Sequence, residues 1–130
     1  MINSNVFDYV NVIGKAADAS WLRNDILANN IANVDTPGYK RQDVNFESQL
    51  RRALGNSRYQ TVDSKVAHVT STELEPRVYT DSANFSYRLD GNNVDIDTEN
   101  VELASTQIKY NALIDSVTHE FNMYKAALAK

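Results

Sequence analysis

The chain has 130 residues, a formal net charge of −4 and no cysteine. This length normally corresponds to one domain, and the acidic balance argues against a dedicated nucleic-acid-binding protein. The lack of cysteine excludes disulfides, thiolate nucleophiles and cysteine-based zinc sites. No stretch is long and apolar enough to predict a transmembrane segment. The N-terminal sequence Met-Ile-Asn-Ser-Asn-Val-Phe-Asp has neither a basic nor an apolar signal region, so we expect no Sec-type signal peptide.

A long amphipathic helix is predicted from about Val6 to Ala32. Its apolar positions alternate spacings of four and three, which is the heptad pattern of a helix that packs along a partner helix. At 1.5 Å per residue this helix is about 40 Å long, which is unusual in a small compact domain. The simpler interpretation is a globular helix with a broad apolar stripe. The seam consists of Val6, Val10, Ile13, Ala17, Ser20, Asn24, Leu27 and Ile31, of which Ser20 and Asn24 are polar.

The residues after this helix predict a sharp turn. Pro37 has a fixed φ and no N–H, so the helix cannot continue through it, and it favours an extended conformation at Thr36. Pro37 followed by Gly38 fits the central positions of a type II turn, where glycine supplies the positive φ. Asn33 fits the end of the helix, where asparagine tolerates the left-handed conformation. Asn29 and Asn33 share one helix face, and such amides need partners if they are buried.

The middle of the chain is more polar and less regular than its two ends. We predict a short helix from Val44 to Leu54. Alternating apolar and polar residues predict a strand over Phe85–Leu89. Asp90–Gly91 then predict a turn, followed by a second short strand that contains Val94 and Ile96. The segment forms either a small β element or a loop that is ordered only by its neighbours.

A second long helix is predicted from about Thr98 to Ala129, with strict four-three spacing of its seam. Asp97 is a good N-cap, and Glu99 and Glu102 favour the positive end of the helix dipole. Burial is expected to be greatest in the middle of the seam, from Tyr110 to Phe121. The seam consists of Leu103, Gln107, Tyr110, Ile114, Val117, Phe121, Tyr124 and Leu128, of which Gln107 is polar.

Candidate catalytic and metal-binding residues are sparse. His68 and His119 stand outside any known metal or catalytic motif, so solvated side chains are the simpler interpretation. The acidic stretch Asp90–Asp97 fails the spacing of an EF-hand, because its glycine directly follows the first aspartate. We therefore expect no catalytic residue, no metal and no cofactor. A basic cluster predicts either a solvated face or a contact with an acidic neighbour, and it consists of Lys40, Arg41, Arg51 and Arg52.

Two long heptad helices at the two ends of one chain predict that these helices pack together. The expected fold is mainly α, with the terminal helices paired as a coiled coil and a small irregular or β central segment. We place the boundaries of the three parts at residues 1–35, 36–95 and 96–130. A two-helix hairpin of this kind leaves apolar surface exposed on its outer sides, which indicates contact with neighbouring molecules.

The stretch from Ala28 to Arg41 resembles the N-terminal signature of the flagellar rod and hook axial proteins. Asp90–Asp97, which leads into the last helix, and Gln107–Leu113 are similar to the proximal rod members of this family. Distal rod and hook proteins carry a different sequence before the last helix and are usually much longer. The resemblance assigns to assembly the residues Asn29, Asn30, Ile31, Ala32, Asn33, Thr36, Pro37, Gly38 and Tyr39.

The resemblance implies a structural subunit and not an enzyme. Proteins of this family pack their N- and C-terminal helices as an inner coiled-coil domain, and many subunits stack around a central export channel. The implied location is the rod of the flagellar basal body, beyond the cytoplasmic membrane, after export through the flagellar type III apparatus. The implied partners are other copies of the chain, other proximal rod proteins, the hook-basal-body adaptor FliE, the membrane ring and the export gate, with no nucleic acid.

Two other classes of function stay open on the residues alone. A soluble coiled-coil adaptor or export chaperone would share the heptads, but it has no need of the asparagine-rich and Pro-Gly-Tyr signature. An enzyme is disfavoured, because no nucleophile, base and orienting residue form a recognisable group.

Overall fold

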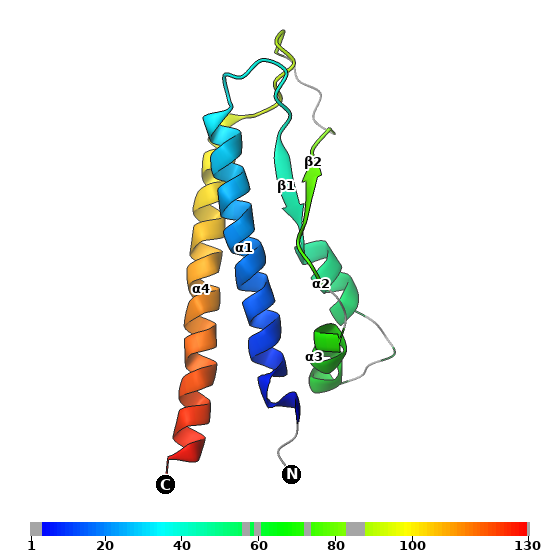
Figure 1. Cartoon of the computed structure of the whole chain (residues 1–130), viewed down its shortest axis with the longest axis vertical. Coiled ribbons are helices and arrows are strands. Elements are labelled where there is room, and N and C mark those ends of the chain that lie inside the picture. The colour runs from blue at the N-terminus through cyan, green and yellow to red at the C-terminus, as the bar shows by residue number, and fades with distance from the viewer. Residues whose placement is uncertain (1–3, 56–57, 59–60, 72–73, 83–87, 130) are drawn as a thin grey trace.

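Two long helices run side by side over the length of the molecule, and the middle of the chain lies against one of them (Figure 1). The first is α1 (Asp8–Ala32), which follows a short 3-10 helix (Ser4–Phe7), and the last is α4 (Ile96–Leu128). The two helices are antiparallel, and the predicted fold class, mainly α with the terminal helices paired as a coiled coil, is confirmed. The computed structural model describes residues 4–55, 58, 61–71, 74–82 and 88–129.

The central segment forms a small sheet and two short helices that pack mainly on α1 (Figure 1), and its side chains also reach α4 through the ion pairs Glu47–Lys109 and Arg41–Glu99. β1 (Gln42–Asn45) pairs residue for residue with β2 (Arg77–Thr80) in an antiparallel ladder. α2 (Glu47–Leu54) follows β1 almost directly, and α3 (Val62–Ser71) packs against both α1 and α2. α1 therefore provides most of the surface on which the central segment packs.

A small apolar core holds the central segment on α1. Phe46, between β1 and α2, is buried together with Ala19 of α1, Val69 of α3 and Leu74. Leu27, farther along α1, is fully buried as well. Full burial of a large apolar side chain contributes roughly 1.5–3 kcal/mol. These contacts fix the position of β1, α2 and α3 relative to the long helix pair.

α4 begins at Ile96 and is capped by Asp95, so the predicted cap at Asp97 is wrong by two residues. The Asp95 carboxylate accepts hydrogen bonds from the N–H groups of Asp97 at 3.1 Å and Thr98 at 3.4 Å. The bonds from the backbone and side chain of Thr98 lead in lowering the pKa of Asp95 below its ordinary value. Asp97 cannot be the cap, because the residue before it is already helical.

Parts of the central segment differ from the prediction. The predicted short helix is present as α2, but the residues before Phe46 form β1. The predicted strand at Val94 and Ile96 is wrong, since Val94 is buried in irregular chain and Ile96 starts α4. The predicted strand over Phe85–Leu89 lies mostly outside the described residues, and Leu89 belongs to the turn that ends at Gly91. The elements β2 and α3 were not predicted.

The seam of α1 faces inward along most of the helix. Ala17, Ser20 and Leu27 are buried, and Val6, which lies in the 3-10 helix before α1, is 38% exposed. The remaining seam residues are half-buried, namely Val10, Ile13, Asn24 and Ile31.

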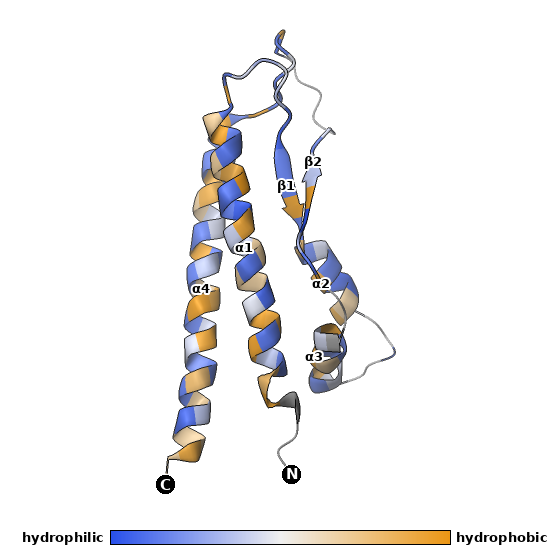
Figure 2. Cartoon of the chain, viewed as in Figure 1, coloured by the Kyte–Doolittle hydropathy of each residue, from blue (hydrophilic) through white to orange (hydrophobic). Residues whose placement is uncertain are grey.

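The seam of α4 is only partly covered. Alternate positions are half-buried against α1, namely Leu103, Tyr110, Val117 and Tyr124. The positions between them are exposed, namely Gln107, Ile114, Phe121 and Leu128. Apolar residues recur along the whole length of α4 (Figure 2), yet no helix among the described residues has the length and apolarity needed to cross a membrane.

The prediction that burial on α4 peaks between Tyr110 and Phe121 is wrong for the single chain. The fully buried or nearly buried residues of this helix are Glu99 and Thr106, close to its start. In this register Thr106 takes an inward position that the apolar pattern assigns to Gln107. The physical reason is a set of polar contacts near the start of α4, described next.

Candidate functional site

The turn after α1 has the predicted geometry. The Tyr39 N–H donates to Thr36 O at 3.2 Å, and Gly38 between them has a φ of 72°. Glycine adopts this left-handed conformation without strain. Asn33 caps α1 with a φ of −104°, so the expected left-handed conformation at this residue is wrong. The Asn33 side chain instead donates to Asn29 O at 2.8 Å.

Asn30 joins three parts of the chain. Its side chain is 0% exposed. Its amide pairs with both backbone groups of Gln42, because Nδ2 donates to Gln42 O at 2.7 Å and Oδ1 accepts from Gln42 N–H at 3.0 Å. Oδ1 also accepts from the Tyr39 hydroxyl at 3.1 Å, and Nδ2 donates to the Glu99 carboxylate at 3.0 Å. Both donors and the acceptor of the amide are therefore satisfied.

The residues from the end of α1 to Gln42 form one side of what we call the signature junction. The stretch before α4 closes this junction from the other side. Asn92 is fully buried. The Gly38 N–H donates to Asp90 O at 2.8 Å, which joins the two turns directly. The two stretches that carry the family resemblance, one after α1 and one before α4, are thus one structural unit. The Asn92 Nδ2 atom lies 2.9 Å from three backbone oxygens, those of Asn33, Val34 and Thr36.

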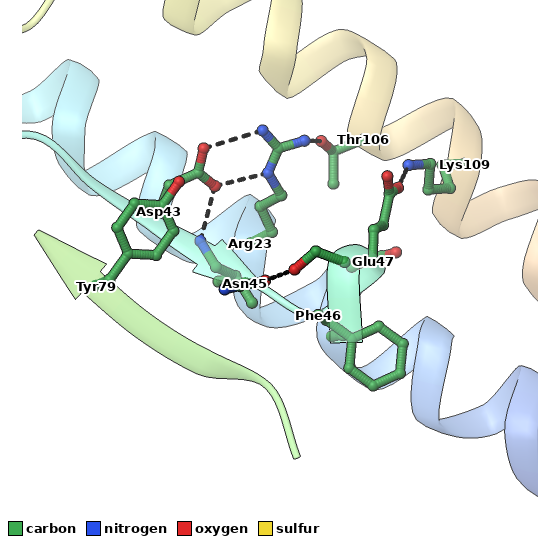
Figure 3. Close-up of a pocket in the computed structure, with 12 residues that line it drawn as sticks. Arg23, Asp43, Asn45, Phe46, Glu47, Tyr79, Thr106 and Lys109 are labelled. Carbon is green, nitrogen blue, oxygen red and sulfur yellow. Dashed lines mark hydrogen bonds and ion pairs between the residues drawn. The ribbon is translucent and has the colours of Figure 1, made fainter. Parts of the chain in front are cut away.

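Arg23 of α1 connects β1 with α4. It donates to both oxygens of Asp43, at 2.7 Å and 3.1 Å. The same guanidinium donates to Glu102 at 3.0 Å and to Thr106 at 3.2 Å. Figure 3 shows Arg23 lying between Asp43 of β1 and Thr106 of α4. Two parallel bonds between a guanidinium and a carboxylate make a strong and directional contact.

Arg41 is the second centre of the network. It pairs with Glu99, with Asp43 at 3.0 Å and with Asp81 at 2.9 Å. Burial alone would lower the pKa of Arg41, but the bonds to Glu99 and Asp43 raise it above the ordinary value. Burial would likewise raise the pKa of Asp43, while hydrogen bonds led by the one from Arg23 hold that pKa below its ordinary value. Such charges are stable only as a set, because removal of one partner leaves another buried and unpaired.

A cavity of about 400 Å³ lies beside this network, between α1, β1, the start of α2 and α4 (Figure 3). Its charged side chains pair with one another, Arg23 with Asp43 and Lys109 with Glu47. In the described part of the chain, no three histidines or carboxylates lie close enough to hold a metal ion. The contacts of Arg23 with Asp43 and Thr106 fix the relative positions of α1, β1 and α4.

The nine predicted signature residues gather in this junction with unequal burial. Asn30 is buried, and Ile31, Asn33 and Tyr39 are half-buried. The remaining members are exposed, namely Asn29, Ala32, Thr36, Pro37 and Gly38. Hydrogen bonds within the chain link the polar members, for example from the Thr36 hydroxyl to Asn33 Oδ1 at 3.1 Å.

Several residues of the junction were not predicted as site residues. Arg41 was predicted to face solvent or an acidic neighbour, and the acidic groups that it binds belong to its own chain. Glu99 was predicted as an ordinary helix-start residue, yet it is fully buried. Arg23 and Asp43 carry no sequence signal that distinguishes them from surface charges.

Comparisons with known proteins find relatives of this chain. The family model described as flagella basal body rod protein matches residues 15–40, which cover most of α1 and the turn after it. The flagellar basal body rod protein FlgB of Bacillus subtilis (strain 168) is 36% identical over 108 residues, which are 82% of this chain and 82% of that protein. FlgB of Borrelia hermsii is 32% identical over 127 residues, covering 90% and 93%. FlgB of Salmonella typhimurium is 36% identical over 95 residues, covering 68% and 69%.

The paired terminal helices, the signature junction and the family match together define a structural protein of the flagellar basal-body rod. Within this class, the family is decided by the sequence identity to the FlgB relatives and by the share of each chain that the matches cover. The chain belongs to the FlgB family of flagellar basal body rod proteins.

Proposed function

We propose that the chain is a structural subunit of the proximal rod that polymerises through its terminal helices. The observation that carries the proposal is the incomplete burial of α4. Ile114 is 41% exposed, Phe121 50% and Leu128 83%, all on one face of the helix. An extended apolar surface on a soluble chain marks an interaction site. Neighbouring subunits that cover this face would add the burial that the single chain lacks.

In this proposal many copies stack their α1–α4 pairs around a common axis. α4 has 33 residues and is therefore about 50 Å long. A contact between two different surfaces of identical subunits that does not close on itself builds a helical filament. The resulting hollow shaft would link the membrane base to the distal rod and hook and would serve as the export channel.

The signature junction has an indirect role in this assembly. Asn30 and Arg41 hold β1 on the end of the helix pair, so they set the direction in which the central segment leaves it. The exposed signature residues, such as Asn29 and Pro37, lie on the surface of the junction where a neighbouring subunit can contact them. We assign no catalysis and no cofactor to the chain.

The partners that we propose are other copies of the chain, other proximal rod proteins, the adaptor FliE, the membrane ring and the export gate. We further propose that the chain leaves through the flagellar type III apparatus. A chain whose longest helix has few buried residues in the monomer is suited to export, because it completes its packing on docking.

The proposal is tested in a strain that lacks the chain. We expect no complete basal bodies in that strain, and restored basal bodies that contain the tagged chain when it is supplied again. Complete basal bodies in its absence would overturn the proposal. Restored motility with the chain found outside purified basal bodies would instead favour a soluble adaptor or chaperone.

A further inference from the structure

A second groove lies between the two long helices without any contribution from the central segment. It has a volume of about 500 Å³, and its walls include Trp21, Asn24 and Asp25 of α1 and Tyr110 of α4. Trp21 is 65% exposed, and its ring lies 5.7 Å from that of Tyr110, centroid to centroid, with a tilt of 48°. A large aromatic ring held at the surface in this way is typical of a contact site.

The groove presents acceptor oxygens to a cation that donates hydrogen bonds. Asn24 Oδ1 is buried and has no hydrogen-bond partner among the described residues. Asp25 lines the groove, and Asp18 lies outside it on the same face of α1. Both carboxylates are exposed, and neither has an ion-pair partner in the described part of the chain. An arginine fits these groups best, because its guanidinium offers five donors and a flat face that stacks on aromatic rings.

Arginines of this kind are available on another element of the same molecule. α2 carries Arg51 and Arg52, which are exposed and have no ion-pair partner in the regions that the structure describes. The groove is lined by residues of α1 and α4 alone, and Arg51 lines a separate cavity with Leu113 of α4, so neither arginine is part of the groove of its own chain. Two unpaired acids on one face and two unpaired bases on another make the chain complementary to a second copy of itself.

We propose that the groove of one copy binds α2 of the next copy. In this contact a guanidinium from Arg51 or Arg52 stacks on Trp21 and pairs with Asp25, while a donor reaches Asn24 Oδ1. Because the two surfaces differ, the contact is head to tail and can repeat along a filament. This inference rests on the proposed polymerisation and names the surfaces that carry it.

The test is a charge exchange in the strain that lacks the chain. One variant carries Asp18→Arg with Asp25→Arg, a second carries Arg51→Glu with Arg52→Glu, and a third carries all four changes. Opposed like charges at an interface are strongly unfavourable, so each double variant should lower basal-body yield by about tenfold or more. The fourfold variant restores the attraction and should recover most of the yield.

Two controls accompany this exchange. Glu75 and Arg77 are also exposed, and reversing both charges leaves the net charge unchanged, so this variant should assemble normally. Trp21→Leu removes the aromatic face but no charge, and it should lower the yield as well. Circular dichroism of each purified variant should match that of the unaltered chain, because all the changed side chains are exposed.

Each other result counts against the inference. Normal yield in either double variant would show that these charges do not meet in the rod. Loss of yield that the fourfold variant fails to recover would assign the groove to a different protein. If the unaltered chain itself is missing from basal bodies, the proposed function fails, which is a separate outcome.

Discussion

Replacement of Asn30 by alanine is expected to destabilise the single chain, independently of assembly. The change leaves the N–H and C=O of Gln42 and one oxygen of Glu99 without their partner in a buried site. A buried group left unpaired costs about 1–3 kcal/mol, and alanine regains about 0.5 kcal/mol of helix propensity. Arg41 still pairs with Glu99. Counting the two backbone groups alone, we expect the free energy of unfolding to fall by roughly 2–5 kcal/mol.

The assay is urea unfolding of the purified chain, followed by circular dichroism. Asn29→Ala is the matched control, because Asn29 is the exposed neighbour on the same helix, and its change should stay within about 0.5 kcal/mol. Local helix propensity alone predicts the opposite order, with both variants equal to or more stable than the original chain. If Asn30→Ala proves as stable as Asn29→Ala, the reasoning from burial and hydrogen bonding is refuted.

Three further predictions concern stability. Gly38→Ala should lower the free energy of unfolding by about 1 kcal/mol, because alanine is strained at a φ of 72°. Gly14→Ala within α1 should raise the free energy of unfolding by a similar amount, because alanine has the higher helix propensity. Equal urea midpoints of the two variants would contradict this. Since the folded-state pKa of Asp43 is lowered, its stabilising effect is present above the unfolded pKa of about 3.9 and is lost as pH falls through the folded pKa. Asp43→Asn should therefore flatten the acid side of the stability profile in urea titrations, and an unchanged slope would count against the pairing. Hydrogen exchange should be faster in the second half of α4, which lacks buried residues, than around Leu27, and uniform protection in a dilute monomer would exclude this.

The long helices and the turn follow from local signals in the sequence. Heptad spacing predicts the helices α1 and α4. Pro37 followed by Gly38 strongly favours a type II turn. α3 carries the same kind of signal, since Val62, Val66 and Val69 have helical spacing. Their β-branched side chains and the polar residues between them hide that signal. β2 is four residues long and exposed throughout, so no apolar pattern marks it.

The junction could not be predicted from the sequence, because its contacts join polar residues far apart in the chain. Glu99 is 58 residues from Arg41 and 69 from Asn30. Acidic and basic residues are usually exposed, and nothing local shows that these particular ones pair and become buried. The same contacts explain the register of α4, which turns Thr106 towards Arg23 where an apolar pattern alone favours its neighbour.

The central claim is that the exposed face of α4 becomes buried in the rod, and Ile114→Asp tests it most directly. Ile114 is 41% exposed, so an aspartate should change the stability of the single chain little, whereas burial of that charge under a neighbouring subunit costs several kcal/mol. The measurement is the amount of chain in purified basal bodies relative to the amount exported, with Ile114→Leu as the control. We predict that the aspartate variant is folded and exported but missing from basal bodies, while the leucine variant is incorporated. Equal incorporation of both variants, with normal swimming, would contradict the account.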